Sequence, residues 1–130
     1  MVEIFESATT HTMIAVKDLE VAKKFYGGTL GLQTFDERHG VAVRYETQGD
    51  TWFMVYTSER AAPTETTRMK FEVEDIEVAV KELRDRGVVF EEYVVPGVEP
   101  VDGIYTHESG ARGAWFKDPE GNILQIGQYN

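Results

Sequence analysis

One stretch of this sequence occurs twice, and this repeat constrains the fold more than any other feature. The first copy covers residues 11–24 (HTMIAVKDLEVAKK) and the second covers residues 68–81 (RMKFEVEDIEVAVK), an offset of 57 positions. The identical pairs at this offset are Val16 and Val73, Asp18 and Asp75, Glu20 and Glu77, Val21 and Val78, Ala22 and Ala79, and Lys24 and Lys81. A self-match at a fixed offset indicates repeated structural units. Two copies are too few for a solenoid, so we expect two related modules packed into one unit.

Each copy has the pattern of a strand that runs into a helix. Apolar residues alternate with their neighbours around residues 14–16 and 71–73, which is the period of a strand. The aspartate that follows, Asp18 or Asp75, is suited to accept hydrogen bonds from the free N–H groups of a first helical turn. Apolar positions then recur at helical spacing over residues 18–30 and 75–86, with glycines at the ends of both stretches.

The rest of the chain predicts three further strands in each half. They are expected at residues 32–37, 41–47 and 51–57 in the first half, and at 88–95, 111–117 and 123–129 in the second. Residues 58–66 form a linker, and residues 96–110 form a long irregular loop that is a candidate lid. Each half is therefore βαβββ. We expect one α+β domain over residues 1–130, with module one at about 8–58 and module two at about 67–130.

The composition excludes several classes of function. The 130 residues carry a formal net charge of −10, whereas nucleic-acid binding needs a basic face. No nucleic acid and no membrane surface is expected as a partner. Acidity is compatible with a cationic ligand, although it is more often a solubility feature. The sequence has no cysteine, which excludes disulfides, thiolate metal ligands and a cysteine nucleophile. No stretch has the pattern of a leader or the length of a membrane span, so a cytoplasmic protein is expected.

Three segments carry a family resemblance. They are residues 11–19 (HTMIAVKDL), residues 25–32 (FYGGTLGL) and residues 115–126 (WFKDPEGNILQI). Their order and spacing resemble the vicinal oxygen chelate superfamily, which includes glyoxalase I, extradiol dioxygenases, and bleomycin-resistance and fosfomycin-resistance proteins. The resemblance implies that two βαβββ modules curl their sheets into a half-barrel around a cavity. It also implies a homodimer, often with the cavity built across the two chains.

Metal-dependent members of this family place four ligands on the first and last strands of the two modules. The ligands are His, Glu or sometimes Gln, a set that suits a divalent ion with open positions for two substrate oxygens. Carried over onto this sequence, the positions are His11, Arg68, Gln125 and Phe53, with Met54 in place of Phe53 if the register of that strand differs.

The residue types at these positions do not favour a metal. The permanent positive charge of the arginine would repel a divalent ion across a small cavity. We therefore predict no bound metal and no other cofactor. A divalent metal, if present, would be held by His11 and Gln125, with Glu72, His39 or His107 as replacement ligands.

Strand alternation predicts which side chains face the cavity. If Ile14 and Val16 lie under the first helix, His11 faces the other, concave side, and Arg68, Lys70 and Glu72 do the same in the second module. In the last strand, Leu124 and Ile126 are expected in the core, and Ile123, Gln125 and Gly127 in the cavity. In the fourth strand, Trp52, Met54 and Tyr56 are expected in the core and Phe53 in the cavity. The predicted ligand-binding residues are His11, Phe53, Arg68, Lys70, Tyr105, Trp115 and Gln125.

Each of these residues also has a purely structural explanation. His11 fits as a satisfied polar residue at the start of a strand, and Arg68 fits as the ion-pair partner of Glu72. Gln125 fits as a side chain that bonds backbone. The three aromatic candidates, Phe53, Tyr105 and Trp115, fit as ordinary packing.

Two functional hypotheses follow. The first is a small-molecule-binding protein with a degenerate metal site, such as a bleomycin-resistance-like sequestering protein. The second is a glyoxalase or other lyase, isomerase or dioxygenase-type enzyme of the same superfamily, with an altered or absent metal site. Without metal, His11 or Glu72 would act as a general base and Arg68 would stabilise an enolate-like oxyanion. We favour the binder, and Arg68 and Lys70 favour an anionic or carboxylate-bearing ligand.

Overall fold

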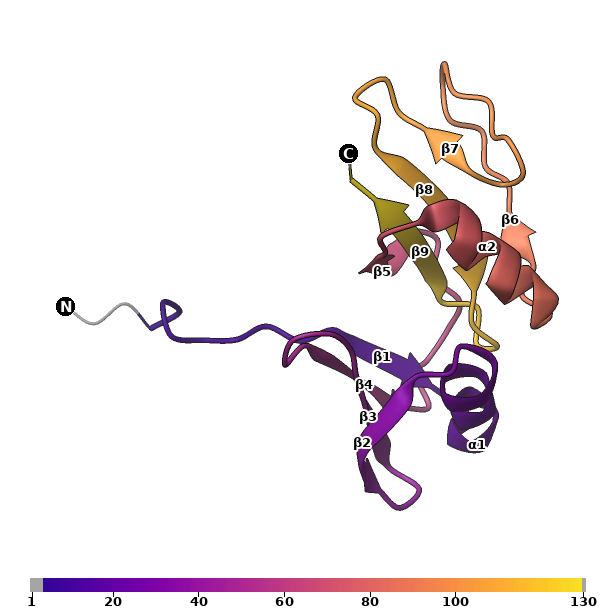
Figure 1. Ribbon diagram of the computed structural model, residues 1–130. Helices are drawn as coiled ribbons and strands as arrows, with labels where there is room; N and C mark the ends of the chain where they lie inside the picture. The colour runs from indigo at the N-terminus through magenta and orange to yellow at the C-terminus, as the bar shows by residue number, and fades with distance from the viewer. Residues whose placement is uncertain (1–3, 130) are drawn as a thin grey trace.

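Both copies of the repeated stretch fold as the sequence predicts, as a strand followed by a helix. The computed structural model describes residues 4–129, and the ends of the predicted domain, residues 1–3 and 130, lie outside them. In the first copy, β1 (Met13–Val16) leads into α1 (Leu19–Lys23). In the second, β5 (Thr67–Glu72) leads into α2 (Ile76–Asp85) (Figure 1).

The two repeated aspartates cap these helices. Asp18 Oδ1 accepts a hydrogen bond of 3.1 Å from the N–H of Val21. Asp75 Oδ1 accepts hydrogen bonds of 3.1 and 3.2 Å from the N–H groups of Glu77 and Val78. The repeat therefore encodes a strand, a cap and a helix start in both modules.

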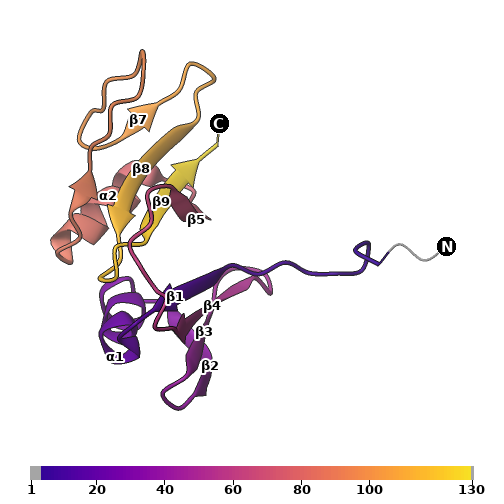
Figure 2. The same cartoon turned by 180° about the vertical axis from the view of Figure 1, so that it is seen from behind.

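The strands form two mixed sheets (Figures 1 and 2). The first has the order β1-β4-β3-β2, with β1 parallel to β4. The second has the order β5-β9-β8-β6, with β5 parallel to β9 and the short β7 paired with β8. The remaining strands are β2 (Gln33–Arg38), β3 (Ala42–Glu46), β4 (Trp52–Thr57), β6 (Phe90–Glu91), β7 (Tyr105–Thr106), β8 (Arg112–Lys117) and β9 (Ile123–Gln128). This is the predicted α+β fold of two βαβββ modules.

One hydrophobic core joins the two modules. Ile14 and Val16 of β1 are buried with Leu124 and Ile126 of β9, as strand alternation predicts. Helix α1 continues as a π-helix, η1 (Lys24–Thr29), and the two helices together take the place of the single helix predicted for residues 18–30. None of the helices within residues 4–129 has the length and apolar surface that crossing a lipid bilayer requires.

The second module departs from its predicted strands. Strand β6 covers only Phe90–Glu91 of the predicted 88–95, and β7 lies within the loop predicted for 96–110. The intervening chain forms two small turns, closed by the bridges Val95 to Val98 and Val101 to Ile104. Backbone groups in this segment are paired locally, so its β-branched residues do not extend the sheet.

The predicted facing of the fourth strand is wrong by one residue. Phe53 and Val55 of β4 are buried in the core, and Trp52, Met54 and Tyr56 face the other way. The prediction aligned Gly49 with Gly121. In the structure both β-hairpin turns close over five residues, after the pairs Glu46 with Trp52 and Lys117 with Ile123, so Gly121 corresponds to Asp50. Both of these residues have positive φ, 93° for Gly121 and 53° for Asp50.

Candidate functional site

The candidate site is a cavity of about 190 Å³ on the face of the second sheet that lies opposite α2. Strands β5, β7, β8 and β9 form its floor and the chain around residues 95–111 forms its rim. Its lining residues are Lys70, Glu72, Val95, Val98, Tyr105, His107, Ala111, Arg112, Gly113, Trp115, Gln125, Gly127, Gln128 and Tyr129.

Two rows of cross-strand neighbours cover this floor. In the first row, Lys70 of β5 pairs with Gln125 of β9, which pairs with Trp115 of β8. The second row runs from Glu72 on β5 through two glycines to an aromatic ring on β7, and its members are Glu72, Gly127, Gly113 and Tyr105. The centre of the second row therefore has no side chains of its own.

The two central glycines leave space for the side chains of Gln125 and Glu72 to lie flat on the sheet. A Cβ at Gly113 would come within 2.6 Å of Gln125 Nε2, and a Cβ at Gly127 would come within 2.8 Å of Glu72 Oε1. The amide of Gln125 thus extends over Gly113 along the floor. Within residues 4–129, no hydrogen bond occupies this amide, so its donor and acceptor are both free to meet a ligand.

Two aromatic side chains, Tyr105 and Trp115, form one wall of the cavity, and Tyr93 packs against Trp115 without lining the cavity itself. The rings of Tyr105 and Trp115 meet edge to face, with centroids 5.1 Å apart and planes at 73°, and Tyr93 meets Trp115 in the same manner at 5.9 Å. Trp115 Nε1 donates to Thr67 Oγ1 at 3.0 Å, and the Tyr105 hydroxyl donates to the carbonyl of Tyr93 at 2.9 Å. These bonds fix the rings, which gives a ligand a rigid apolar surface.

The charges in the cavity are already paired. Lys70 Nζ donates to Tyr129 Oη at 2.8 Å and forms an ion pair with Glu72 Oε1 at 3.1 Å. The hydrogen bond to Tyr129, followed by that to Glu72, raises the pKa of Lys70 above its ordinary value. Glu72 Oε2 also accepts the backbone N–H of Tyr129 at 3.0 Å. The lysine and the glutamate therefore satisfy each other.

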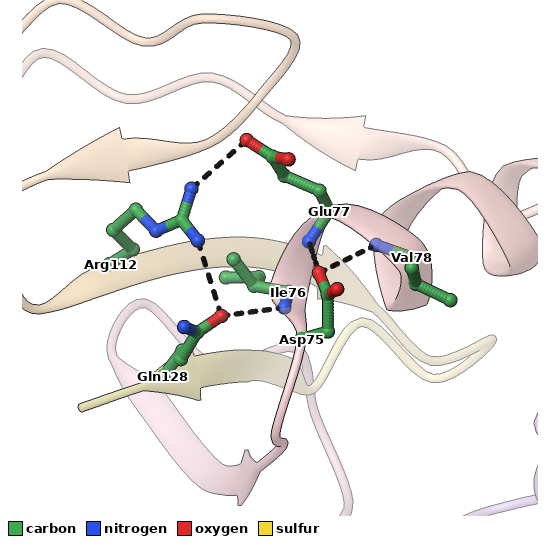
Figure 3. Close-up of polar contacts among 6 residues, drawn as sticks. All are labelled: Asp75, Ile76, Glu77, Val78, Arg112 and Gln128. Carbon is green, nitrogen blue, oxygen red and sulfur yellow. Dashed lines mark hydrogen bonds and ion pairs between the residues drawn. The ribbon is translucent and has the colours of Figure 1, made fainter. Parts of the chain in front are cut away.

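A polar network at the rim ties the cavity to the start of α2 (Figure 3). Arg112 donates to Glu77 Oε1 at 3.1 Å and to Gln128 Oε1 at 3.3 Å. The same oxygen of Gln128 accepts the N–H of Ile76 at 2.8 Å. Figure 3 shows the guanidinium turned toward the helix, so its charge is used to anchor α2.

The structure brings four of the seven predicted ligand-binding residues together. Lys70, Tyr105, Trp115 and Gln125 all line the cavity, with Glu72 beside them. The other three lie elsewhere. Phe53 is 4% exposed, packs against Tyr26, Tyr45 and Phe71 in the core, and borders a separate hollow between β4 and β5.

His11 and Arg68 are both outside the cavity. The His11 ring stacks on Trp52 with centroids 3.4 Å apart, and its Nδ1 lies 3.1 Å from the carbonyl oxygen of Trp52. A carbonyl only accepts, so Nδ1 carries the proton, and Nε2 faces the hydroxyl of Thr9 at 3.0 Å. Arg68 is exposed at an irregularity in the pairing of β5 with β9, and Glu72 pairs with Lys70 instead.

The family's four metal-ligand positions do not fit a divalent ion in this chain. The corrected register places Met54 at the fourth position, beside Met13 on β1. The set is then an imidazole with both nitrogens engaged, a thioether, a guanidinium and an amide, in which only the imidazole is a good ligand for such an ion. Residues 4–129 also contain no group of three or more histidines and carboxylates arranged around a common metal position.

The two alternative histidines do not complete a metal site either. His39 is fully exposed in the turn after β2 and faces Glu37 at 3.7 Å. His107 lines the cavity, but its Nδ1 is bonded to Ser109 Oγ at 2.9 Å.

The sequence interpretation missed Gly113, which shapes the floor beside the predicted Gly127, and Tyr129, which binds Lys70. A signal for Gly113 was present, because a glycine inside a strand often marks a close approach of another group. Tyr129 follows β9 directly and had no such signal.

Comparisons with known proteins agree with this fold. A family model described as the Glyoxalase/Bleomycin resistance protein/Dioxygenase superfamily matches residues 9–126. A search of curated proteins finds no match.

Solved structures with the same fold are similar over nearly the whole chain. A glyoxalase family protein from Enterococcus faecalis is 20% identical, with a TM-score of 0.71 over 95% of this chain and 99% of that chain. An antibiotic binding protein from Streptomyces sp. CB03234 is 22% identical, with a TM-score of 0.67 over 95% of this chain and 98% of that chain. A fosfomycin resistance protein from Listeria monocytogenes is 15% identical, with a TM-score of 0.68 over 95% of this chain and 94% of that chain.

These identities are low, so the solved structures establish the fold alone. The family model, in contrast, matches all but a few residues at each end of the sequence. The chain belongs to the Glyoxalase/Bleomycin resistance protein/Dioxygenase superfamily.

Proposed function

We propose that this protein binds a small organic molecule, without a metal, in the cavity over β8 and β9. The observation that carries the proposal is the free amide of Gln125, which lies over Gly113 beside the fixed rings of Trp115 and Tyr105. A mostly apolar cavity with a few oriented polar groups is the usual form of a small-molecule site. The aromatic wall favours a flat ligand, and the amide favours one with a hydrogen-bonding edge.

The polar residues suit binding better than catalysis. A general base needs a lone pair within reach of the substrate, without a competing donor. Lys70 holds one oxygen of Glu72 and the N–H of Tyr129 holds the other, so a substrate must compete with both for the carboxylate. Both ring nitrogens of His11 are engaged by Trp52 and Thr9, outside the cavity. This arrangement supports the binder over an enzyme of the same superfamily.

Known proteins of this fold support the same proposal. One is described as an antibiotic binding protein and another as a fosfomycin resistance protein. We infer that sequestration of a small molecule, as in bleomycin-resistance proteins, is a suitable role for this chain as well.

A homodimer belongs to the proposal. The cavity of one chain is only partly enclosed, and a second copy placed over it would bury the ligand. The location in the cytoplasm and the single domain over residues 1–130 remain predictions.

A thermal-shift screen tests the proposed function. Aromatic antibiotics and aromatic carboxylates would be added to the protein in EDTA, and the compound with the largest increase in melting temperature would be taken to calorimetry. We expect Gln125→Ala to weaken its binding about tenfold, the usual effect of losing a well-placed hydrogen bond in a binding site.

The matched control for this experiment is Gln48→Ala, which removes the same amide from the exposed turn between β3 and β4. We expect it to bind like the wild type. Equal binding by Gln125→Ala and the wild type would contradict the proposed site.

A further inference from the structure

A stack of four side chains lies on the face of the first sheet opposite α1. The guanidinium carbon of Arg44 on β3 lies 4.0 Å from the ring centre of Phe35 on β2 and 4.2 Å from that of Trp52 on β4. The ring of His11, just before β1, stacks on Trp52 at 3.4 Å. Aromatic contacts from two neighbouring strands therefore hold Arg44 in one orientation.

The positive charge of this arginine has no counter-ion among residues 4–129. Arg44 forms no ion pair there, although the sequence has 23 acidic and 13 basic residues. Its Nε is buried without a hydrogen-bond partner. Its two terminal nitrogens are not buried in this way, so they are open to solvent. Arg112, which is half-buried to a similar degree, pairs with Glu77 at 3.1 Å.

The missing counter-ion follows from the local backbone. Asp36 is the cross-strand partner of Arg44, but the pairing of β2 with β3 is irregular between Thr34 and Asp36. This irregularity directs Phe35 against the guanidinium instead of the carboxylate. The sheet thus holds a cation in one orientation, and its cross-strand neighbour Asp36 forms no ion pair with it.

Apolar side chains lie on the strands next to Arg44, on the same face of the sheet as its solvent-exposed terminal nitrogens. Met54 is its cross-strand partner on β4, and Met13 is the partner of Met54 on β1. Met13 is 46% exposed and Phe35 is 56% exposed. Thioethers make favourable contacts with aromatic rings, so the row beside the cation suits a flat apolar group.

We propose that Arg44 is an anion site that binds the carboxylate of a planar aromatic molecule, with the ring on Met54 and Met13. A guanidinium binds a carboxylate through two parallel hydrogen bonds, and a fixed guanidinium loses little freedom when it does so. This site is on the first sheet and does not depend on the cavity of the second sheet.

The two tryptophans allow this site to be tested separately from the cavity. In a Trp115→Phe variant, Trp52 is the remaining tryptophan and lies in contact with Arg44. The probes are biphenyl-4-carboxylate and its neutral carboxamide, titrated to millimolar concentration by Trp52 fluorescence and by calorimetry. We expect the carboxylate to bind at least about tenfold more tightly than the carboxamide, because charge-assisted hydrogen bonds are the stronger ones.

Variants of the arginine complete the experiment. Arg44→Met should reduce carboxylate binding to the level of the carboxamide, and Arg44→Lys, which keeps the charge but loses the planar fork, should bind with intermediate affinity. Arg60→Met, at an exposed position after β4, should bind like the parent protein.

Three results would overturn the proposal. The first is equal affinity for the two probes, and the second is unchanged carboxylate affinity in both Arg44 variants. The third combines two observations: the parent protein binds neither probe, and Arg44→Met changes the oligomeric state measured by light scattering. In that case a carboxylate of a second copy occupies the arginine, and the small-molecule site is wrong.

Discussion

The hydroxyl of Tyr26 donates a 2.6 Å hydrogen bond to Asp118 Oδ2 and so joins η1 of the first module to the turn before β9 of the second. Both side chains are buried, at 0% and 4% exposure. Asp118 accepts three more hydrogen bonds, from the backbone of Glu120 and from the backbone and side chain of Asn122. The carboxylate is thereby satisfied without a cation, and the modules are joined by a polar network inside a shared core.

Removing the hydroxyl should destabilise the protein clearly. We expect Tyr26→Phe to lower the free energy of unfolding by about 1.5–3 kcal/mol, the range for hydrogen bonds to charged groups and for buried acceptors that lose a donor. Urea unfolding measures this difference. Tyr56→Phe, on the opposite face of β4, is the matched control and should change stability by less than about 0.5 kcal/mol. A loss below that value in Tyr26→Phe would contradict a role for the bond between the modules.

The same tyrosine should make the protein sensitive to alkaline pH. Burial, followed by the charge of Asp118, raises the pKa of Tyr26 far above its ordinary value of 10.0. Below about pH 10 the tyrosine is neutral in both states, so the stability is intact. At higher pH the unfolded chain loses the proton while the native protein keeps it, and the free energy of unfolding falls by about 1.4 kcal/mol per pH unit.

Urea unfolding between pH 8 and pH 11 measures this slope. Burial also raises the pKa of Tyr45, which adds to the slope in the wild type and persists in the variant. Tyr26→Phe should therefore show a shallower decline above pH 10. Parallel curves for the two proteins would show that Tyr26 titrates normally in the native state.

Filling the floor of the cavity should impair binding more than stability. In Gly113→Ala the new Cβ would lie 2.6 Å from Gln125 Nε2, so the amide must leave its position over β8. We expect binding of the best compound from the thermal-shift screen to weaken by about tenfold or more, with the fold retained. Gly28→Ala is the matched control, since its Cβ would meet no atom within 4 Å. Equal effects of the two substitutions would argue against the glycine floor.

Metal ions should have little effect on this protein. We expect elemental analysis of protein purified without a histidine tag to find no near-stoichiometric metal. Nickel, zinc, manganese and iron(II) should leave the melting temperature unchanged, because Met54, Arg68 and Gln125 are poor ligands beside an engaged His11. A stoichiometric metal that is lost in His11→Ala would reverse this interpretation and favour an enzyme.

The parts of the fold that local sequence patterns determine were predictable. The repeat located both helix caps, Asp18 and Asp75, because an aspartate just before an apolar helical pattern is usually an N-cap. The facing of β1 and β9 followed from strand alternation alone. The register of β4 did not, because it depends on the number of residues in the turn before the strand. Gly49 and Asp50 both adopt positive φ in that turn, 60° and 53°, so the glycine alone does not determine the register.

The features of the candidate site that were missed depend on long-range contacts. Stacking of His11 on Trp52 joins residues 41 positions apart, and it removes the histidine from the set of free ligands. The contact of Arg44 with Phe35 requires an irregularity in strand pairing, and no local sequence motif predicts that irregularity. Lys70 and Gln125 were found because strand alternation placed them on the concave face, and the family resemblance placed Gln125 there as well.

The most direct test of the central claim, metal-free binding in the cavity over β8 and β9, is a fluorescence titration of a Trp52→Phe variant in EDTA. In this variant Trp115 is the remaining tryptophan. The account predicts that the best compound from the screen changes Trp115 emission with saturation, and that Gln125→Ala shifts the curve about tenfold to higher concentration. Binding seen by calorimetry without a change in Trp115 emission, or binding that EDTA abolishes, would contradict it.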